Sequence, residues 1–164
     1  METSKLPPSA QLSFFPTDSQ MDFWKRLNAG ESLDCPCCKR HAMIYTRKIH
    51  TSIALQLINL YRLGGHVAYI HTSKLIAPGS SGIGDFSKAK YWGLIEPKEN
   101  TDDDKKSSGY WRLTSIGIAF VRGKQSVAGA ALVFDDKVIG FTDDPTDIRA
   151  ALGHKFSYDE LMNG

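Results

Sequence analysis

The feature that most constrains the fold of this chain is the order of the elements that the sequence predicts between His50 and Gly123. A long apolar helix ends at Gly64, and a short strand follows over HVAYI. Two short helices are then predicted at residues 72–77 and 85–92, and the second runs straight into YWGLIEP. After a polar loop the chain continues as GYWRLTSIGIAFVRG, which we expect to form the partner strand.

The long helix is apolar over most of its circumference, with Leu or Ile at many positions. Either Thr51 or Ser52 is expected to cap its start, and the pair Gly64 and Gly65 is expected to end it. A helix with such a wide apolar surface is packed on several sides. We therefore expect it to be the central helix of a small domain.

The segments YWGLIEP and GYWRLTSIGIAFVRG resemble the wing hairpin of winged-helix regulators, whose strands often read GLIE and Y-x-LT-x-x-G. The resemblance covers under half of the chain. It implies an α+β fold with a winged-helix (winged helix-turn-helix) core. An N-terminal helix and a cysteine knuckle would precede this core, and a C-terminal β-hairpin plus helix would follow it. The whole-chain pattern also resembles small proteins of phages and their bacterial hosts.

In a winged helix the third helix enters the major groove of double-stranded DNA, so the resemblance directs attention to residues 85–92. Phe86, Ala89 and Trp92 are spaced to face the core of the domain. Lysine can reach a phosphate or a guanine edge, and tyrosine can bond phosphate or stack on a base. The residues expected to contact DNA are Ser87, Lys88, Lys90 and Tyr91 on the third helix, Lys74 on the second helix and Arg112 on the wing strand. The alternative is that they form the solvated side of a short helix.

Charge is distributed unevenly along the chain. Residues 35–125 carry fourteen Lys or Arg against six Asp or Glu, a charge of +8, whereas residues 1–34 carry −2 and residues 126–164 carry −4. A basic middle part favours nucleic-acid binding, because phosphate neutralisation supplies most of the sequence-independent affinity. The polar loop at 97–108 is mixed in sign, however, and a wing dedicated to phosphate contacts would have fewer carboxylates.

All three cysteines lie in the cluster CPCC at residues 35–38, which cannot build a disulfide framework. A C-P-x-C turn brings two sulfurs within reach of one metal ion and resembles a zinc knuckle. A structural Zn²⁺ takes about four ligands. The set that we expect is Cys35, Cys38, His41 and His50, with Cys37 as a possible substitute.

Two other interpretations of the cysteine cluster remain open. It is a degenerate knuckle if the reduced cysteines act only as small apolar side chains. The spacing of Cys35 and Cys38 also fits a redox pair, although the thioredoxin-like βαβ context is missing. Lys39 and Arg40 favour the thiolate form of their neighbours in either case.

The chain divides into four expected parts. These are an N-terminal arm with a short helix at 1–34, the cysteine knuckle at 35–49, the winged-helix domain at 50–125, and a hairpin-helix appendage at 126–164. The short helix of the first part buries either Met21, Trp24 and Leu27, or Phe23 and Leu27.

The last part of the chain begins with AALVFDDKVIGF, which predicts a two-stranded hairpin around Asp135 and Asp136. Pro145 is then expected to open a short helix that ends at Gly153. This part is not required by a minimal winged helix, so it is available to close the core, to form a dimer or to bind a partner.

Several function classes find no support in the sequence. The chain has no P-loop, no G-x-S-x-G and no H-E-x-x-H motif, so we expect no enzymatic activity. No apolar run approaches the roughly 20 residues of a membrane span, and the N-terminus lacks a signal pattern, so we expect a cytoplasmic protein without a membrane partner.

Two functional hypotheses follow. The first is a winged-helix DNA-binding protein, a small phage or bacterial regulator with a structural zinc ion. The second is a protein interaction module, such as a phage-encoded inhibitor or assembly factor, that docks through residues 126–164. The sequence does not predict the oligomeric state.

Overall fold

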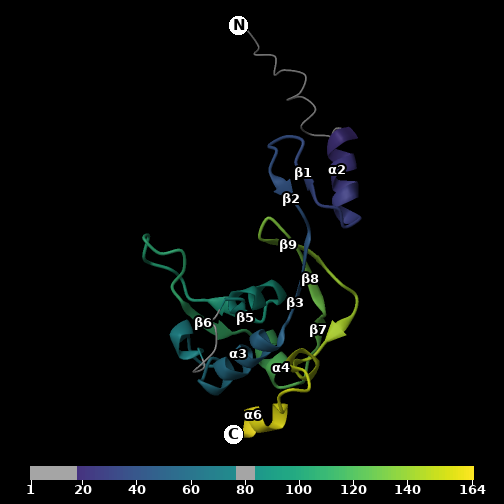
Figure 1. Ribbon diagram of the computed structural model, residues 1–164. Coiled ribbons are helices and arrows are strands. Elements are labelled where there is room, and N and C mark those ends of the chain that lie inside the picture. The colour runs from purple at the N-terminus through teal and green to yellow at the C-terminus, as the bar shows by residue number, and fades with distance from the viewer. Residues whose placement is uncertain (1–17, 77–83) are drawn as a thin grey trace.

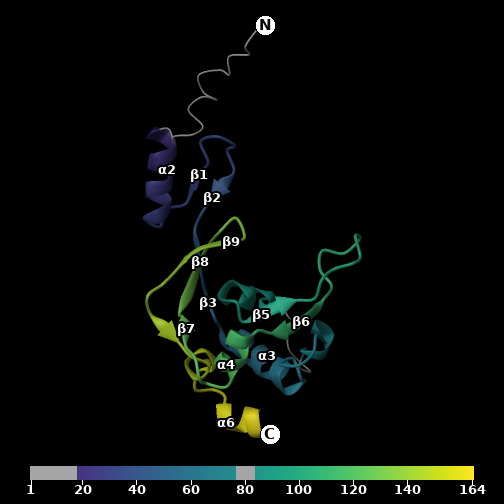
Figure 2. The same cartoon turned by 180° about the vertical axis from the view of Figure 1, so that it is seen from behind.

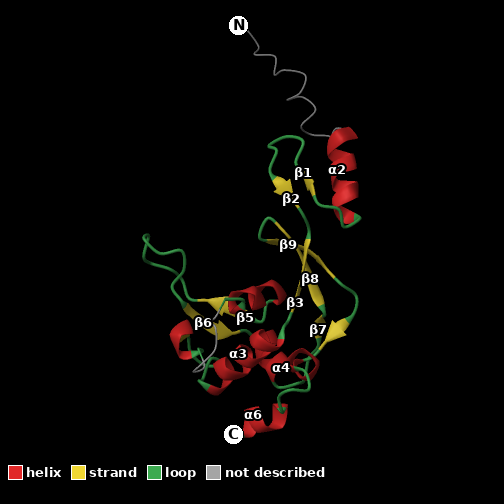
Figure 3. Ribbon diagram, in the orientation of Figure 1, coloured by secondary structure: helices red, strands yellow, loops and turns green. Residues whose placement is uncertain are grey.

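The computed structural model describes residues 18–76 and 84–164, and it mixes helices with several small antiparallel sheets (Figure 1, Figure 3). The α+β class is therefore confirmed. The N-terminal arm predicted for residues 1–16 and most of the Gly/Ser turn before residue 84 lie outside the described residues. No described helix has the length and apolar character needed to cross a membrane.

The middle of the chain follows the order of elements that the sequence predicts. Its elements are α3 (Thr51–Arg62), β4 (Ile70–His71), the 3-10 helices η2 (Thr72–Lys74) and η3 (Phe86–Trp92), β5 (Ile95–Pro97) and β6 (Tyr110–Leu113). The three strands form an antiparallel sheet in the order β4, β6, β5, so the last strand lies between the other two. Strands β5 and β6 pair on either side of the long polar loop.

Helix α3 is the centre of the main core, as its apolar sequence predicts. Ile53, Leu57 and Ile58 are almost completely buried and belong to the same cluster as the side chains of η3 and β6. The predicted cap at Thr51 or Ser52 is wrong, because the position before the first helical residue is His50, whose side chain makes no capping hydrogen bond.

The strand predicted over HVAYI is also wrong for most of its length. The amides of Val67 and Ala68 both bond to the carbonyl of Gly64 at 3.0 Å, so the chain continues to turn after α3. Val67 is 77% exposed, and only Ile70 of the predicted segment enters a strand. The turn at the two glycines overrides the β propensity of the valine and tyrosine side chains.

The segment SIGIAFV is a helix, α4 (Ser115–Val121), and not the continuation of the wing strand. The hydroxyl of Thr114 accepts a hydrogen bond of 3.0 Å from the amide of Gly117 and thereby caps the helix. Gly117, Phe120 and Val121 are buried, so the spacing is helical. A Cβ atom at Gly117 would lie 1.9 Å from the carbonyl oxygen of Leu94, which explains the glycine at this contact.

A second antiparallel sheet joins distant parts of the chain. Strand β3 (Tyr45–Lys48) pairs with β8 (Ala130–Phe134), which in turn pairs with β9 (Lys137–Phe141). The hairpin predicted around Asp135 and Asp136 is confirmed, and both residues have positive φ angles, 48° and 60°, as a tight two-residue hairpin turn requires.

The remaining C-terminal elements pack close to α3. Strand β7 (Val127–Ala128) pairs with β10 (Pro145–Thr146), so no helix begins at Pro145. Helix α5 (Ile148–Leu152) begins one turn later with Asp147 as its cap, and helix α6 (Tyr158–Asn163) follows. Ile148 and Leu152 belong to the main core cluster. The residues predicted as an appendage therefore complete the core around α3.

The first described elements form a small unit that we call the N-terminal module: α2 (Asp18–Asn28), β1 (Leu33–Asp34) and β2 (His41–Ala42). Phe23 and Leu27 face Ala42 in a second, separate core cluster, which confirms the Phe23 and Leu27 alternative for the buried stripe. Seen from front and back, the module lies at one end of the molecule, beyond β3 and away from α3 (Figure 1, Figure 2).

Candidate functional site

Two surfaces carry the residues that the sequence singles out, and the first surrounds η3. Phe86, Ala89 and Trp92 are buried as predicted, and the indole of Trp92 donates a hydrogen bond of 2.8 Å to the carbonyl of Ala128. The backbone is a 3-10 helix, and it ends at Gly93 with a left-handed φ of 69°. The buried side chains of η3 therefore fix the direction in which its polar side chains point.

Lys88 forms an ion pair with Asp85, just before the first turn of η3. The hydrogen bond from Lys88 lowers the pKa of Asp85, and the charges of His50 and Arg47 act in the same direction. Arg47 and His50 therefore lie on the same side of the molecule as this pair. A lysine predicted to contact DNA is neutralised by its own neighbour in the free protein.

Tyr91 is half-buried, and its hydroxyl donates a hydrogen bond of 3.3 Å to Asp136 at the tip of the β8–β9 hairpin. Burial raises the pKa of Tyr91, and the nearby charge of Asp136 raises it further. The ammonium of Lys90 lies 5.8 Å from the centre of the Tyr91 ring. The structure thus places the tyrosine against the hairpin, while Ser87 and Lys90 are exposed to solvent.

The two remaining predicted DNA contacts, Lys74 and Arg112, lie on η2 and β6. Arg112 is opposite Glu96 in the sheet and forms an ion pair with it, and its guanidinium also lies 4.8 Å from the centre of the Tyr69 ring. Lys74 is exposed. Of the six predicted residues, Lys88, Tyr91 and Arg112 contact acidic residues, while Arg112 is also exposed, as are Ser87, Lys74 and Lys90.

The polar loop between β5 and β6 contains an internal turn. Lys105 forms an ion pair of 3.1 Å with Asp102, and the amide side chain of Asn100 donates a hydrogen bond of 2.5 Å to the carbonyl of Lys105. Residues of the loop therefore stabilise one another, and side chains of both charges remain exposed at its surface.

No family model, curated protein or solved structure matches this chain. Its function is therefore inferred from the chemistry of the two surfaces. Arg40 lines a pocket beside the cysteines, and the guanidinium of Arg47 lies 4.8 Å from the centre of the Tyr45 ring, which lines the same pocket.

The second surface is the cysteine turn between β1 and β2. The amide of Cys35 bonds to the carbonyl of Arg40 at 2.8 Å, and the amide of Lys39 bonds back to the carbonyl of Cys35 at 2.9 Å. Lys39 has a left-handed φ of 62°, which closes the turn. Backbone hydrogen bonds from Cys38 and Cys37 lower the pKa of the Cys35 thiol. The turn therefore stabilises a thiolate at Cys35.

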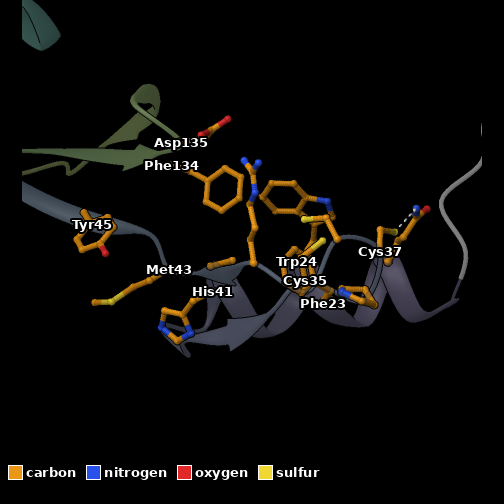
Figure 4. A pocket seen from close by; sticks show the side chains of 14 residues that line it. Phe23, Trp24, Cys35, Cys37, His41, Met43, Tyr45, Phe134 and Asp135 are labelled. Atoms are coloured by element: carbon orange, nitrogen blue, oxygen red, sulfur yellow. Dashed lines mark hydrogen bonds between the residues drawn. The ribbon is translucent and has the colours of Figure 1, made fainter.

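A pocket of about 610 Å³ opens beside this turn (Figure 4). The rings of Trp24 and Phe134 meet edge to face, with their centres 5.1 Å apart, and form one wall of the pocket. The other residues of the lining are Gln20, Phe23, the four residues 35–38, Arg40, His41, Ala42, Met43, Tyr45 and Asp135. Aromatic and other apolar side chains thus form much of the pocket lining, while Cys37 and Cys38 themselves are exposed.

The structure does not gather the four predicted zinc ligands. His41 pairs with Asp34 across β1 and β2, and its Nδ1 atom lies 3.2 Å from the Asp34 carboxylate, although His41 also lines the pocket beside the cysteines (Figure 4). His50 precedes α3, at the far end of β3. Within residues 18–76 and 84–164, no three His, Cys, Asp or Glu side chains come together as a metal site. Bound zinc remains a prediction.

The contact between Trp24 and Phe134 was not predicted from the sequence. The two residues are far apart along the chain, and nothing in their spacing links them. The sequence carries only a weak signal of this contact, which is the position of Trp24 beside the buried stripe of α2. In the structure the side chain of Trp24 remains 41% exposed, which is high for such a large aromatic residue.

Proposed function

We propose that this protein is a winged-helix DNA-binding protein without enzymatic activity, with η3 as the element that enters the major groove. The observation that carries the proposal is the order of elements after α3. Strand β4, helices η2 and η3, and the paired strands β5 and β6 follow one another as in a winged helix, and the polar loop stands where the wing would be.

The charges near η3 support the proposal. Lys88 and Lys90 project from its polar side, and Arg47 lies close enough to act on Asp85. Phosphate oxygens bind lysine and arginine through charge-assisted hydrogen bonds, so a DNA backbone can replace Asp85 as the partner of Lys88. Lys74 on η2 and Arg112 on β6 would then contact the flanking backbone.

The same surface also limits the expected affinity. Asp85 and Asp136 lie beside the lysines of η3, and each carboxylate repels an approaching phosphate. We therefore expect binding that is weak at physiological salt and that strengthens markedly as the salt concentration falls.

The test is a titration of a labelled mixed-sequence duplex, followed by fluorescence anisotropy over a series of salt concentrations. Replacing both Lys88 and Lys90 by alanine should weaken binding and reduce the slope of log K against log salt by about 2. The matched control, Lys124→Ala with Lys155→Ala, removes the same charge from exposed sites on other elements. Equal losses in the two double variants, or no binding of the native protein at low salt, would contradict the proposal.

A second candidate is a protein interaction module, and the edge strand β9 favours it. Ile139 and Phe141 are each 47% exposed, and they belong to the segment predicted to dock a partner. In the described sheet β9 pairs on one side only, so a partner strand can add to its free edge. Phe141→Asp should abolish capture of a protein partner by the full chain and leave the DNA titration unchanged.

A further inference from the structure

The cysteine turn provides half of the ligands of a tetrahedral metal site. Cys35 and Cys38 lie in the same hydrogen-bonded turn and line the same pocket. Cys37 lies closer to α2, where the side-chain amide of Gln20 donates a hydrogen bond of 3.7 Å to the Cys37 sulfur (Figure 4). Zn²⁺ in a structural site binds about four nitrogen or sulfur ligands. One turn therefore leaves half of the coordination sphere unfilled.

The described residues of this chain do not supply the missing ligands. Every cysteine and every histidine lies within the described residues. His41 lines the pocket beside the turn but pairs with Asp34, and His50 is separated from the turn by the length of β3. No third His, Cys, Asp or Glu joins the two thiols in the part of the chain that the structure describes.

We propose that two copies of this chain share one zinc ion, and that each copy contributes Cys35 and Cys38. The four sulfurs form a tetrahedral site on a two-fold axis, so the same residues serve on both sides of the contact. As the ion binds, each thiol that is still protonated releases its proton to water, and no oxidation or reduction takes place.

The position of the turn permits this arrangement. Cys38 and Pro36 are exposed, and the turn lies at the end of the N-terminal module that is remote from α3 (Figure 1, Figure 2). A second copy can therefore approach without meeting the main core. The pocket beside the turn also exposes Trp24, Met43 and Tyr45, at 41%, 39% and 45%. Apolar side chains of this kind are covered in self-association contacts.

The experiment uses the full chain, prepared under reducing conditions with added zinc. Zinc content is measured together with the molar mass in solution. We expect one zinc ion for every two chains and a mass of twice 18.2 kDa. A chelator should return the protein to the monomer mass, and renewed zinc should restore the dimer. A titration with Co²⁺ should saturate at one ion per two chains, with the intense sulfur-to-metal absorption of a four-thiolate site.

Variants separate this site from its alternatives. Cys35→Ser and Cys38→Ser should each lose both metal and dimer, whereas Cys37→Ser should keep both. One zinc ion per chain in a monomer, lost in His41→Ala or His50→Ala, would overturn the proposal in favour of a site within one chain. A native protein that binds no zinc, or a dimer that survives the chelator, would also overturn it. None of these measurements involves DNA, so the outcome is independent of the proposed DNA binding.

Discussion

The carboxylate of Asp85 accepts a hydrogen bond from the ammonium of Lys88, the lysine of η3 that we expect to contact DNA. The two side chains are separated by a single helical turn, and the charges of His50 and Arg47 also act on Asp85. A DNA phosphate and Asp85 therefore compete for the same ammonium group. A substitution of Asp85 is therefore as informative a test of DNA binding at η3 as a substitution of Lys88.

Asp85→Asn should strengthen DNA binding, because it frees Lys88 and removes a negative charge from the surface of η3. We expect an increase of several-fold in affinity at low salt, which fades as salt screens the charges. The anisotropy titration described above measures it. Asp22→Asn, at an exposed site on α2 in the N-terminal module, is the control for the change in net charge, and an equal gain in that variant would count against the position of η3 in the complex.

The same aspartate should contribute to the acid sensitivity of folding. Its pKa is lowered in the folded state by the hydrogen bond from Lys88, so the stabilisation is complete above the ordinary pKa of aspartate, about 3.9. It is lost as the pH falls through the lowered value. Urea unfolding of the native protein and of Asp85→Asn should differ near pH 6 and converge toward pH 3. A difference that is independent of pH would exclude the ion pair as its cause.

Thr114 joins the wing strand to α4 through two hydrogen bonds of one hydroxyl group. It accepts from the amide of Gly117 at 3.0 Å and donates to the carbonyl of Gly93. Thr114→Ala should lower the free energy of unfolding by about 1–2 kcal/mol, as the loss of a helix cap does. Thr114→Ser keeps the hydroxyl and should recover most of the loss. Equal losses in the two variants would show that the methyl group is what matters.

Gly117 allows α4 to approach the backbone of Leu94, and alanine should not be tolerated there. Alanine would normally favour a helix by up to about 1 kcal/mol. Here its Cβ would lie 1.9 Å from a carbonyl oxygen, so Gly117→Ala should destabilise the protein by about 1–3 kcal/mol or more. Gly84→Ala is the control, because none of the described residues has an atom within 4 Å of the added Cβ atom. Denaturant unfolding distinguishes the two, and a stable Gly117→Ala would contradict the close contact.

The elements that sequence reasoning identified are those fixed by local patterns. The apolar surface of α3, the buried side of η3 and the hairpin at Asp135 and Asp136 each depend on residues a few positions apart. The errors also have local causes. SIGIAFV directly follows the wing strand and is expected to continue it, but the cap at Thr114 and the contact at Gly117 make it a helix.

The rest depends on contacts between distant residues, which periodicity cannot reveal. Tyr45 pairs with Val133 in the second sheet, and Trp24 meets Phe134 at the pocket. The candidate metal site shows the same limit. The spacing of Cys35 and Cys38 predicts two ligands, but the sequence could not show that the β1–β2 register pairs His41 with Asp34.

The pairing of β3 with β8 also has a consequence for synthesis of the chain on the ribosome. Strand β3 emerges early, but its partner at Ala130–Phe134 is added about halfway between the wing and the C-terminus, and Leu152 of the core comes later still. Helix α3 must therefore expose apolar side chains until the segment from Ala130 to Leu152 has left the ribosome. Emergence of that segment, rather than completion of the wing, is the event after which the core can close.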